Sequence, residues 1–157
     1  MILIAHRGNT KGPNKERENT PDYIDEALNQ GFDVELDVWL GEEGQLFLGH
    51  DEPETQITVN FLRERESRLW CHAKNLEALE FLLEKGFHTF FHDSDEYTIT
   101  SKGYIWAHPN SKLSSKTICV MGTPSTECLG WCSDYVADNF QDPLVYQYTK
   151  TCQLSQS

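Results

Sequence analysis

The sequence predicts a parallel α/β fold for a single domain over residues 1–157, and three features support this class. Aliphatic runs and amphipathic segments alternate through the first half in the order strand, helix, strand, helix, strand, which is typical of parallel sheets covered by helices. Four more strand-like runs follow, joined by links shorter than the roughly dozen residues of a parallel crossover. A length of 157 residues argues for one domain. We therefore expect a trimmed barrel with reduced helices in its second half, or antiparallel pairs there.

The first strand and the first helix have clear boundaries. Residues 2–5 form a continuous apolar run, which predicts a buried strand that ends before Gly8. Thr20 followed by Pro21 predicts a helix start, because threonine caps the first turn and proline fits the first helical position. Gly31 is placed to end that helix.

Further strands and a second helix follow. Residues 33–38 alternate acidic and aliphatic side chains, and residues 45–48 predict a short strand after a glycine-rich turn. Residues 69–73 predict another strand. Asn75 then caps a helix over residues 76–85, whose buried face is expected to carry four leucines: Leu76, Leu79, Leu82 and Leu83.

The second half predicts strands without full helices between them. The strand-like runs cover residues 88–92, 104–108, 117–121 and 131–136. A helical turn or two opening at Thr123-Pro124 is the one helix expected in this half. Residues from about 141 onward carry little that predicts order.

The charge balance restricts the classes of partner. Lys and Arg total 13 against 25 Asp and Glu, which gives a net charge of −12. We expect no binding to nucleic acid or to an anionic membrane surface, because both are negatively charged themselves. A small phosphate ligand remains compatible, since a bound divalent cation can reverse the local field.

The location of the protein is also limited by the sequence. No segment approaches the roughly 18 apolar residues of a membrane span, and the first apolar run is too short for a signal peptide. The five cysteines have no regular spacing and favour reduced thiols over a disulfide framework. We therefore expect a cytoplasmic protein.

Three acidic side chains share one face of the strand predicted at residues 33–38. Side chains two positions apart lie on the same side of a strand, so Asp33, Glu35 and Asp37 point one way. Carboxylates that converge in a partly buried place repel one another and lose hydration. A hard divalent cation would compensate them. The alternative is a half-exposed antiparallel strand with a solvated acidic face.

A second group of polar residues stands where the first strand ends. His6 and Arg7 precede Gly8. Histidine exchanges protons near neutral pH, arginine can bind a phosphate with two parallel hydrogen bonds, and glycine lets the backbone approach a ligand. Taken alone, a structural histidine is the alternative interpretation of His6.

Four motifs occur in order within residues 2–51: Ile4-Ala5-His6-Arg7-Gly8, Glu18-Asn19-Thr20, Glu35-Leu36-Asp37-Val38 and Gly49-His50-Asp51. In this order and spacing they resemble the glycerophosphodiester phosphodiesterase family. Beyond residue 51 the resemblance is patchy, although Cys132-Ser133-Asp134-Tyr135 is similar to the family's closing strand. The resemblance implies a short, divergent member of the PLC-like phosphodiesterase superfamily, with a (β/α) TIM-type barrel and phosphoric diester hydrolase activity.

The resemblance implies roles for the matching residues. His6 and His50 would be the general acid–base pair, and Arg7 would bind the phosphate of a small glycerophosphodiester-like substrate. Glu35 and Asp37 would hold a divalent metal, Mg²⁺ or Ca²⁺ by likeness to the family.

The third strand departs from the family, which usually carries Glu-x-Lys there. This chain has His72-Ala73-Lys74, so Lys74 matches the substrate-contacting lysine and His72 replaces a third carboxylate. If His72 ligates the metal, Mn²⁺ or another ion that accepts nitrogen is expected. A substrate-contacting or structural His72 is the alternative. Four more residues are expected to line the site, at strand ends or beside the first loop: Glu18, His92, His108 and Asp134.

Size is a second departure, because a full barrel has about 250 residues. A shortened barrel would have an open mouth, or one covered by a second copy of the chain in a homo-oligomer. Two other functions stay open: a degenerate phosphate-binding or regulatory barrel, and a metal-dependent lyase or isomerase. Retention of both His6 and His50 favours an enzyme, whereas the missing glutamate at position 72 favours the alternatives.

Overall fold

The computed structural model describes residues 1–138, and the expectation for the segment from about 141 onward concerns residues outside this range. The strands are β1 (Ile2–His6), β2 (Asp33–Leu40), β3 (Leu46–Leu48), β4 (Thr55–Ile57), β5 (Leu69–Ala73), β6 (Thr89–Phe90), β7 (Tyr97–Ile99), β8 (Ile105–Ala107), β9 (Thr117–Val120) and β10 (Gly130–Ser133). The helices are α1 (Pro21–Asn29), α2 (Val59–Arg63) and α3 (Leu76–Glu84), with a 3₁₀ turn η1 (Glu66–Arg68) before β5.

All of these strands belong to one mixed sheet. Its parallel part runs β6-β5-β2-β1-β10-β9-β8. Antiparallel pairs are added at two places: β7 pairs with β8, and the β3–β4 hairpin branches from the end of β2. The second half therefore contains parallel strands without full helices between them as well as an antiparallel pair, the two arrangements expected from its short connections.

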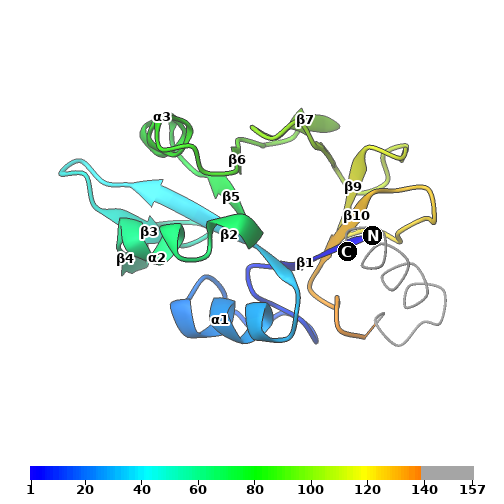
Figure 1. Ribbon diagram of the computed structural model, residues 1–157, viewed down its shortest axis with the longest axis horizontal. Coiled ribbons are helices and arrows are strands. Elements are labelled where there is room, and N and C mark those ends of the chain that lie inside the picture. Colours follow the sequence, from blue (N-terminus) through cyan, green and yellow to red (C-terminus); the bar gives the residue numbers. More distant parts are fainter. Residues whose placement is uncertain (139–157) are drawn as a thin grey trace.

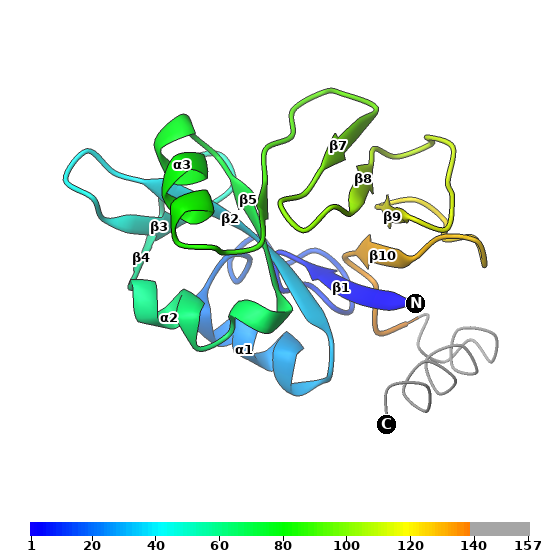
Figure 2. The same cartoon turned by 45° about the horizontal axis from the view of Figure 1, so that its top comes forward.

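The sheet curls so that its two free ends, β6 and β7, come together (Figures 1 and 2). No strand ladder joins them within residues 1–138; individual hydrogen bonds do. The amide of Ser101 donates to the carbonyl of Thr89 at 2.8 Å, and the hydroxyl of Thr98 donates to the carbonyl of Phe91 at 3.0 Å. We call this junction the seam.

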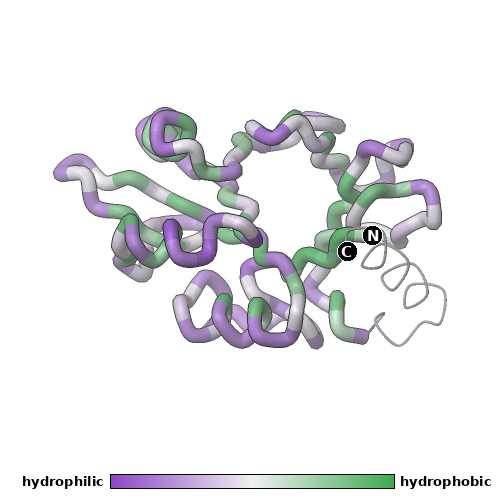
Figure 3. Tube along the Cα trace, in the orientation of Figure 1, coloured by the Kyte–Doolittle hydropathy of each residue, from purple (hydrophilic) through white to green (hydrophobic). Residues whose placement is uncertain are grey.

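The two faces of the curled sheet have different partners. The inner face carries a cluster of buried side chains from strands on all sides: Ile4, Trp70, Phe90, Trp106, Ile118 and Cys132. The outer face of β1, β2 and β5 packs on the helices through a larger apolar cluster that includes Val34, Leu36 and Val38. Figure 3 shows the hydrophobic colour concentrated along strands such as β1, and the hydrophilic colour over the loops.

Helices α1, α2 and α3 all precede β6, and residues 85–138 contain none. The helical turn expected at Thr123-Pro124 is wrong: this stretch is an irregular loop. The loop still has a packing role, because the indole of Trp131 on β10 donates to the carbonyl of Gly122 at 2.9 Å. It lies beside the outward side chains of β9 and β10, where a barrel helix would normally pack. No helix in residues 1–138 has the length and apolar character needed to cross a bilayer.

The predicted helix caps are partly confirmed. The side chain of Asn75 accepts from the amide of Ala78 and also donates to the carbonyl of Leu40, which ties α3 to the end of β2. Thr20 stands at the N-cap of α1, but its hydroxyl donates to the carbonyl of Arg17 instead of capping the helix.

The buried face of α3 is narrower than predicted. Leu82 and Ala78 are fully buried, but Leu76 and Leu83 are 62% and 51% exposed. At 100° per residue these two leucines lie at least 100° around the helix from either member of the buried pair. The sheet covers only the side centred on Ala78 and Leu82, so the expectation that Leu76 and Leu83 face inward is wrong.

Candidate metal and phosphate site

A cavity of about 420 Å³ opens at the carboxyl ends of the parallel strands. Its lining includes every predicted site residue except Glu18 and Asp134. The full lining is His6, Arg7, Glu35, Asp37, His50, His72, Lys74, His92, Asp93, Trp106, His108, Pro109, Val120 and Met121. Residues far apart in the sequence thus meet where barrel-type folds carry their sites.

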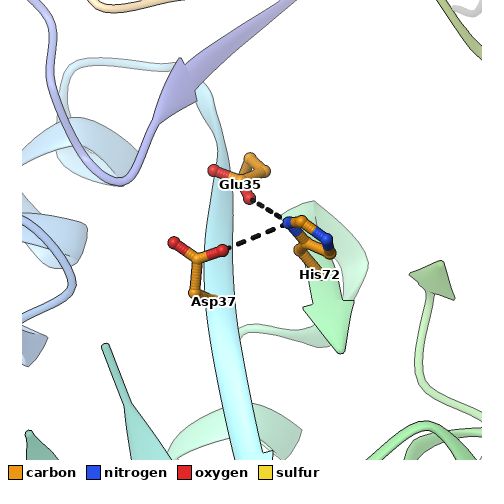
Figure 4. Close-up of side chains that lie close together, drawn as sticks. All are labelled: Glu35, Asp37 and His72. Atoms are coloured by element: carbon orange, nitrogen blue, oxygen red, sulfur yellow. Dashed lines mark ion pairs between the residues drawn. The ribbon is translucent and has the colours of Figure 1, made fainter. Parts of the chain in front are cut away.

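Glu35, Asp37 and His72 form the buried centre of this cavity. Glu35 and Asp37 are two positions apart on β2, and the register pairs Asp37 with His72 on β5. The Nδ1 atom of His72 lies 3.2 Å from Asp37 Oδ1 and 3.7 Å from Glu35 Oε1. Figure 4 shows both carboxylates directed at this one nitrogen.

Asp37 is the most heavily contacted carboxylate of the site. Its Oδ2 atom accepts a hydrogen bond from Asn19 at 2.9 Å and lies 3.2 Å from His50 Nδ1 and 3.4 Å from Arg7 Nε. Burial alone would raise the pKa of Asp37, but contacts with His50, His72 and Asn19 hold that pKa far below its usual range. Asp37 is therefore charged at any physiological pH.

The hydrogen bonding of His72 decides which nitrogen faces the carboxylates. Its Nε2 atom is 3.0 Å from the carbonyl oxygen of His92, which can only accept, so Nε2 carries a proton. In neutral His72 the lone pair is then on Nδ1, directed at Glu35 and Asp37. Burial lowers the pKa of His72, but the two carboxylates outweigh it and raise the value to about 9. The arrangement requires a cation between these three side chains, either a proton or a metal ion.

The donor set fits a divalent metal ion. One ligand atom each from Glu35, Asp37 and His72 lie within 4.8 Å of one another, the spacing expected around an ion with bonds of about 2.0–2.4 Å. Asp37 Oδ1 is buried and has no hydrogen-bond partner, which leaves it available as a ligand. A set of two carboxylates and one imidazole suits Mn²⁺, Zn²⁺ or Fe²⁺ better than Ca²⁺.

His6 is oriented by a residue from the other end of the described chain. Its Nδ1 atom lies 2.8 Å from Asp134 Oδ1, and its Nε2 atom lies 3.9 Å from Glu35 Oε2. Asn9 donates to the same Asp134 oxygen at 2.9 Å. Burial lowers the pKa of His6, but Asp134 and Glu35 together raise it above its ordinary value. Asp134 thus contacts the site through His6 instead of lining the cavity.

Arg7 adopts a left-handed backbone conformation, with φ of 54°. Its amide donates to the carbonyl of Glu35 at 2.9 Å, which holds this strained turn beside β2. Its guanidinium bonds Glu18 at 3.2 Å. Glu18 does not join the metal cluster: it binds Arg7 and Asn9 and lines a smaller adjacent cavity of about 230 Å³.

The β3–β4 hairpin brings His50 back over Asp37. Gly49 has φ of 152°, its amide donates to the carbonyl of Asp37, and a Cβ there would overlap the carbonyl oxygen of Glu52. The indole of Trp39 donates to the carbonyl of Gly49 at 2.7 Å. These contacts fix the turn that presents His50, whose side chain is 40% exposed at the cavity edge.

The three acids of β2 share a face but not a site. Asp33 lies at the opposite end of the strand, where it accepts from the indole of Trp70 at 3.0 Å and pairs with Arg68. The expectation that Asp33 converges with Glu35 and Asp37 is therefore wrong. A step of two positions along a strand is about 6.5–7 Å, so Asp33 is two such steps from Asp37.

Comparison with known proteins supports the fold alone. Neither a protein-family model nor a curated protein matches the sequence. The crystal structure of glycerophosphodiester phosphodiesterase from Agrobacterium tumefaciens str. C58 matches with a TM-score of 0.53 and 14% identity, over 87% of this chain and 97% of that chain. This chain shares its fold with a phosphodiesterase. The similarity supports a barrel-like α/β scaffold.

Several residues of the site escaped sequence reasoning. Asn9 holds Asp134 and Glu18 together, and its partners lie 125 and 9 positions away. Asp93 and Met121 line the cavity from loops after β6 and β9. Only Asn19 had a sequence signal, its place in the Glu-Asn-Thr motif, but its two bonds to Asp37 were not foreseen.

Proposed function

We propose that the protein is a metal-dependent phosphodiesterase that cleaves a small, glycerophosphodiester-like substrate by His/His general acid–base catalysis. The observation that carries this proposal is a pair of histidines beside the possible metal ligands Glu35, Asp37 and His72. His6 and His50 each contact a carboxylate through Nδ1, and both line the cavity that holds Glu35, Asp37 and His72. The shared fold with a phosphodiesterase supports the same reaction class.

The phosphate would bind between the cluster and two cationic side chains. Glu35, Asp37 and His72 would hold the metal ion, which supplies charge stabilisation at phosphoryl oxygens and a lowered pKa for a bound hydroxyl. Arg7 and Lys74 line the same cavity, with Lys74 Nζ 3.7 Å from Asp37 Oδ1. Their positive charges would stabilise the phosphate as its charge rises in the transition state.

The two histidines would move the protons. With Nδ1–H held by Asp134, neutral His6 has its lone pair on Nε2 and can accept a proton from an attacking water or substrate hydroxyl. His50 has Nδ1 held by Asp37, so its Nε2 can deliver a proton to the departing alkoxide. One proton leaves the nucleophile, one reaches the leaving group, and the phosphorus–oxygen bond to that group breaks.

The experiment measures hydrolysis of a glycerophosphodiester and of a chromogenic phosphodiester with Mg²⁺, Ca²⁺ or Mn²⁺. The wild type is compared with His6→Ala and Glu35→Gln, and with Asp33→Asn as the matched control on the same strand face. We expect losses of about 10²–10⁴-fold for His6→Ala and a comparable loss for Glu35→Gln, with activity retained in Asp33→Asn. Equal activity in all four proteins would exclude the proposed mechanism.

A phosphate-binding barrel without turnover is the second candidate, and His72 favours it. Protonated His72 can offset one of the two negative charges of Glu35 and Asp37 without a metal, because its pKa is raised to about 9 by these carboxylates against the effect of burial. Arg7 and Lys74, both near Asp37, offset the other. This candidate predicts that calorimetry detects binding of a phosphodiester in the presence of a strong chelator, with no hydrolysis. Under the first candidate, the chelator abolishes turnover, and turnover returns only when metal is added back.

A further inference from the structure

Two histidines of the cavity have no role in the proposed reaction. His92 follows β6 and His108 follows β8, and both line the cavity. Their ring centroids are 5.7 Å apart, with an interplanar angle of 59°. They face each other near the seam, on strands that no ladder joins within the described chain.

These two rings lack the polar partners that every other histidine has. His6, His50, His72 and His88 each have a ring nitrogen within 3.2 Å of an oxygen atom. By contrast, both ring nitrogens of His92 are buried without a hydrogen-bond partner. Within residues 1–138, neither His92 nor His108 forms an ion pair through its ring. A buried polar group without a partner costs about 1–3 kcal/mol, so a ligand is expected to satisfy the ring nitrogens of His92. His108 is exposed, so its ring is open to a ligand from the cavity.

The backbone at both positions is well anchored. The carbonyl of His92 accepts from His72 Nε2 at 3.0 Å, and the amide of His108 donates to the carbonyl of Glu96 at 2.9 Å. Each ring therefore stands in a loop just beyond a strand end, with one backbone hydrogen bond holding its position. This arrangement resembles a ligand pair prepared before the ligand arrives.

The ring separation fits two imidazoles that share one metal ion. A metal–nitrogen bond is about 2.0–2.1 Å, which places each ring centroid about 3.2 Å from the ion. Two such rings at ordinary angles around the ion have centroids about 5–6 Å apart, and the observed value is 5.7 Å. Asp93, on the same cavity wall, adds negative charge that attracts a cation.

We propose that His92 and His108 bind a second divalent transition-metal ion, of the nitrogen-preferring type represented by Zn²⁺. This site has no ligand in common with the cluster of Glu35, Asp37 and His72, although the carbonyl of His92 accepts from His72 Nε2. Two protein ligands leave coordination positions that water or a phosphate oxygen can fill. The inference does not depend on the proposed phosphodiesterase activity, because it concerns binding alone.

The test counts zinc ions bound to the full chain after metal is stripped with a chelator. Zn²⁺ is titrated against a chromogenic chelator, and protein-bound metal is measured after dialysis. We expect two ions per wild-type chain, one in the His92→Gln/His108→Gln double variant, and one in Glu35→Gln/Asp37→Asn. His88→Gln, which changes a buried histidine outside the cavity, should still bind two.

The double variant decides the proposal. Two ions in His92→Gln/His108→Gln, or one ion in the wild type that Glu35→Gln/Asp37→Asn abolishes, would overturn it. Thermal unfolding checks that each variant is folded. If the double variant does not fold, nitrogen-15 spectra of labelled histidine in the wild type replace it: added Zn²⁺ must shift ring nitrogens of His92 and His108, and unchanged signals there reject the site.

Discussion

The two halves of the molecule cover the outer face of the curled sheet in different ways. Residues 1–84 place β1, β2 and β5 between an inner cluster and a layer of three helices. Residues 85–138 continue the same curled sheet through β6, β8, β9 and β10 without a single described helix. The cluster of Glu35, Asp37 and His72 comes entirely from residues 1–84, the half backed by helices. Residues 85–138 supply cavity walls and supporting contacts that include Asp134 to His6 and the carbonyl of His92 to His72.

The difference indicates that the strands of the second half are positioned by their inner face together with outer-face packing that does not need a helix. Ile118 and Cys132 of the second half are as deeply buried as Leu36 of the first. The outer side of β9 and β10 is closed by a loop whose Gly122 carbonyl accepts from Trp131. A short loop can thus take the place of a helix where no charged cluster has to be held in place.

The largest effect should come from the charge at the centre of the helix-backed half. Asp37→Asn keeps the shape of the side chain but removes the charge that faces His72, His50 and Arg7. We expect kcat/KM to fall on the order of 10³-fold and divalent metal affinity to fall with it. Asp22→Asn, an exposed carboxylate in the first turn of α1, is the control. Unchanged metal affinity in Asp37→Asn would remove Asp37 from the ligand set.

Packing provides a direct comparison of the two halves. Leu82→Ala on α3 and Ile118→Ala on β9 both delete fully buried side chains, so each should lower the free energy of unfolding by about 2–5 kcal/mol. Leu83→Ala, next to Leu82 but half exposed, should stay within about 0.5 kcal/mol. Urea unfolding measures all three. A small cost for Ile118→Ala alone would mean that the second half is not held by its inner face.

Removing the charge of Asp134, which joins the two halves through His6, should have an intermediate effect on activity. Asp134→Asn can still accept from His6 Nδ1 but lacks the charge that helps to raise the pKa of His6. We expect kcat/KM to fall about 10–100-fold, and the titration midpoint of His6 in NMR to move to lower pH. Asp138→Asn, an exposed neighbour, should leave both unchanged. A midpoint that does not move would show that Asp134 only shapes the site.

The smallest expected effect concerns how stability depends on pH through His88, a buried residue just before β6. Burial, with a contribution from Lys102, lowers the pKa of His88 to about 4. Because the unfolded chain binds this proton near pH 6.5, His88 contributes stability above that pH, and the contribution is lost as pH falls from 6.5 toward 4. We expect Tm of the wild type to fall several °C more over this range than Tm of His88→Gln. Parallel Tm curves for the two proteins would contradict this.

Local patterns predicted the apolar strands of both halves and missed the short polar elements. The apolar run of β1, the alternation in β2 and the Asn75 cap of α3 are short-range signals, and the structure has each of them. The polar strands β4 and β7 and the short helix α2 were missed, because three to five residues carry too little periodicity to be recognised. Pairing with β8, not composition, makes a strand of Tyr97–Ile99.

In the candidate site, too, short-range motifs were predicted and long-range contacts were not. The motifs around His6, Glu35 and His50 identified residues that do meet in one cavity. The contacts that orient them could not be read from the chain: Asp134 lies 128 positions from His6, and Asn19 reaches Asp37 only because the loop before α1 folds back. The two-residue period of a strand placed Asp33 on the same face as Glu35 and Asp37. That period does not tell which end of the sheet a residue occupies.

The seam has a consequence for how the chain can be divided. Strand order sets the beginning and the end of the described chain side by side, as β1 and β10, and leaves the middle of the chain at the free ends of the sheet. A break after the exposed Ser94 would interrupt no ladder. Two separately expressed fragments would each keep their own strand neighbours and recognise each other through the four residue pairs of β1 and β10. Mixing them should rebuild the fold, so we expect the chain to tolerate division after Ser94.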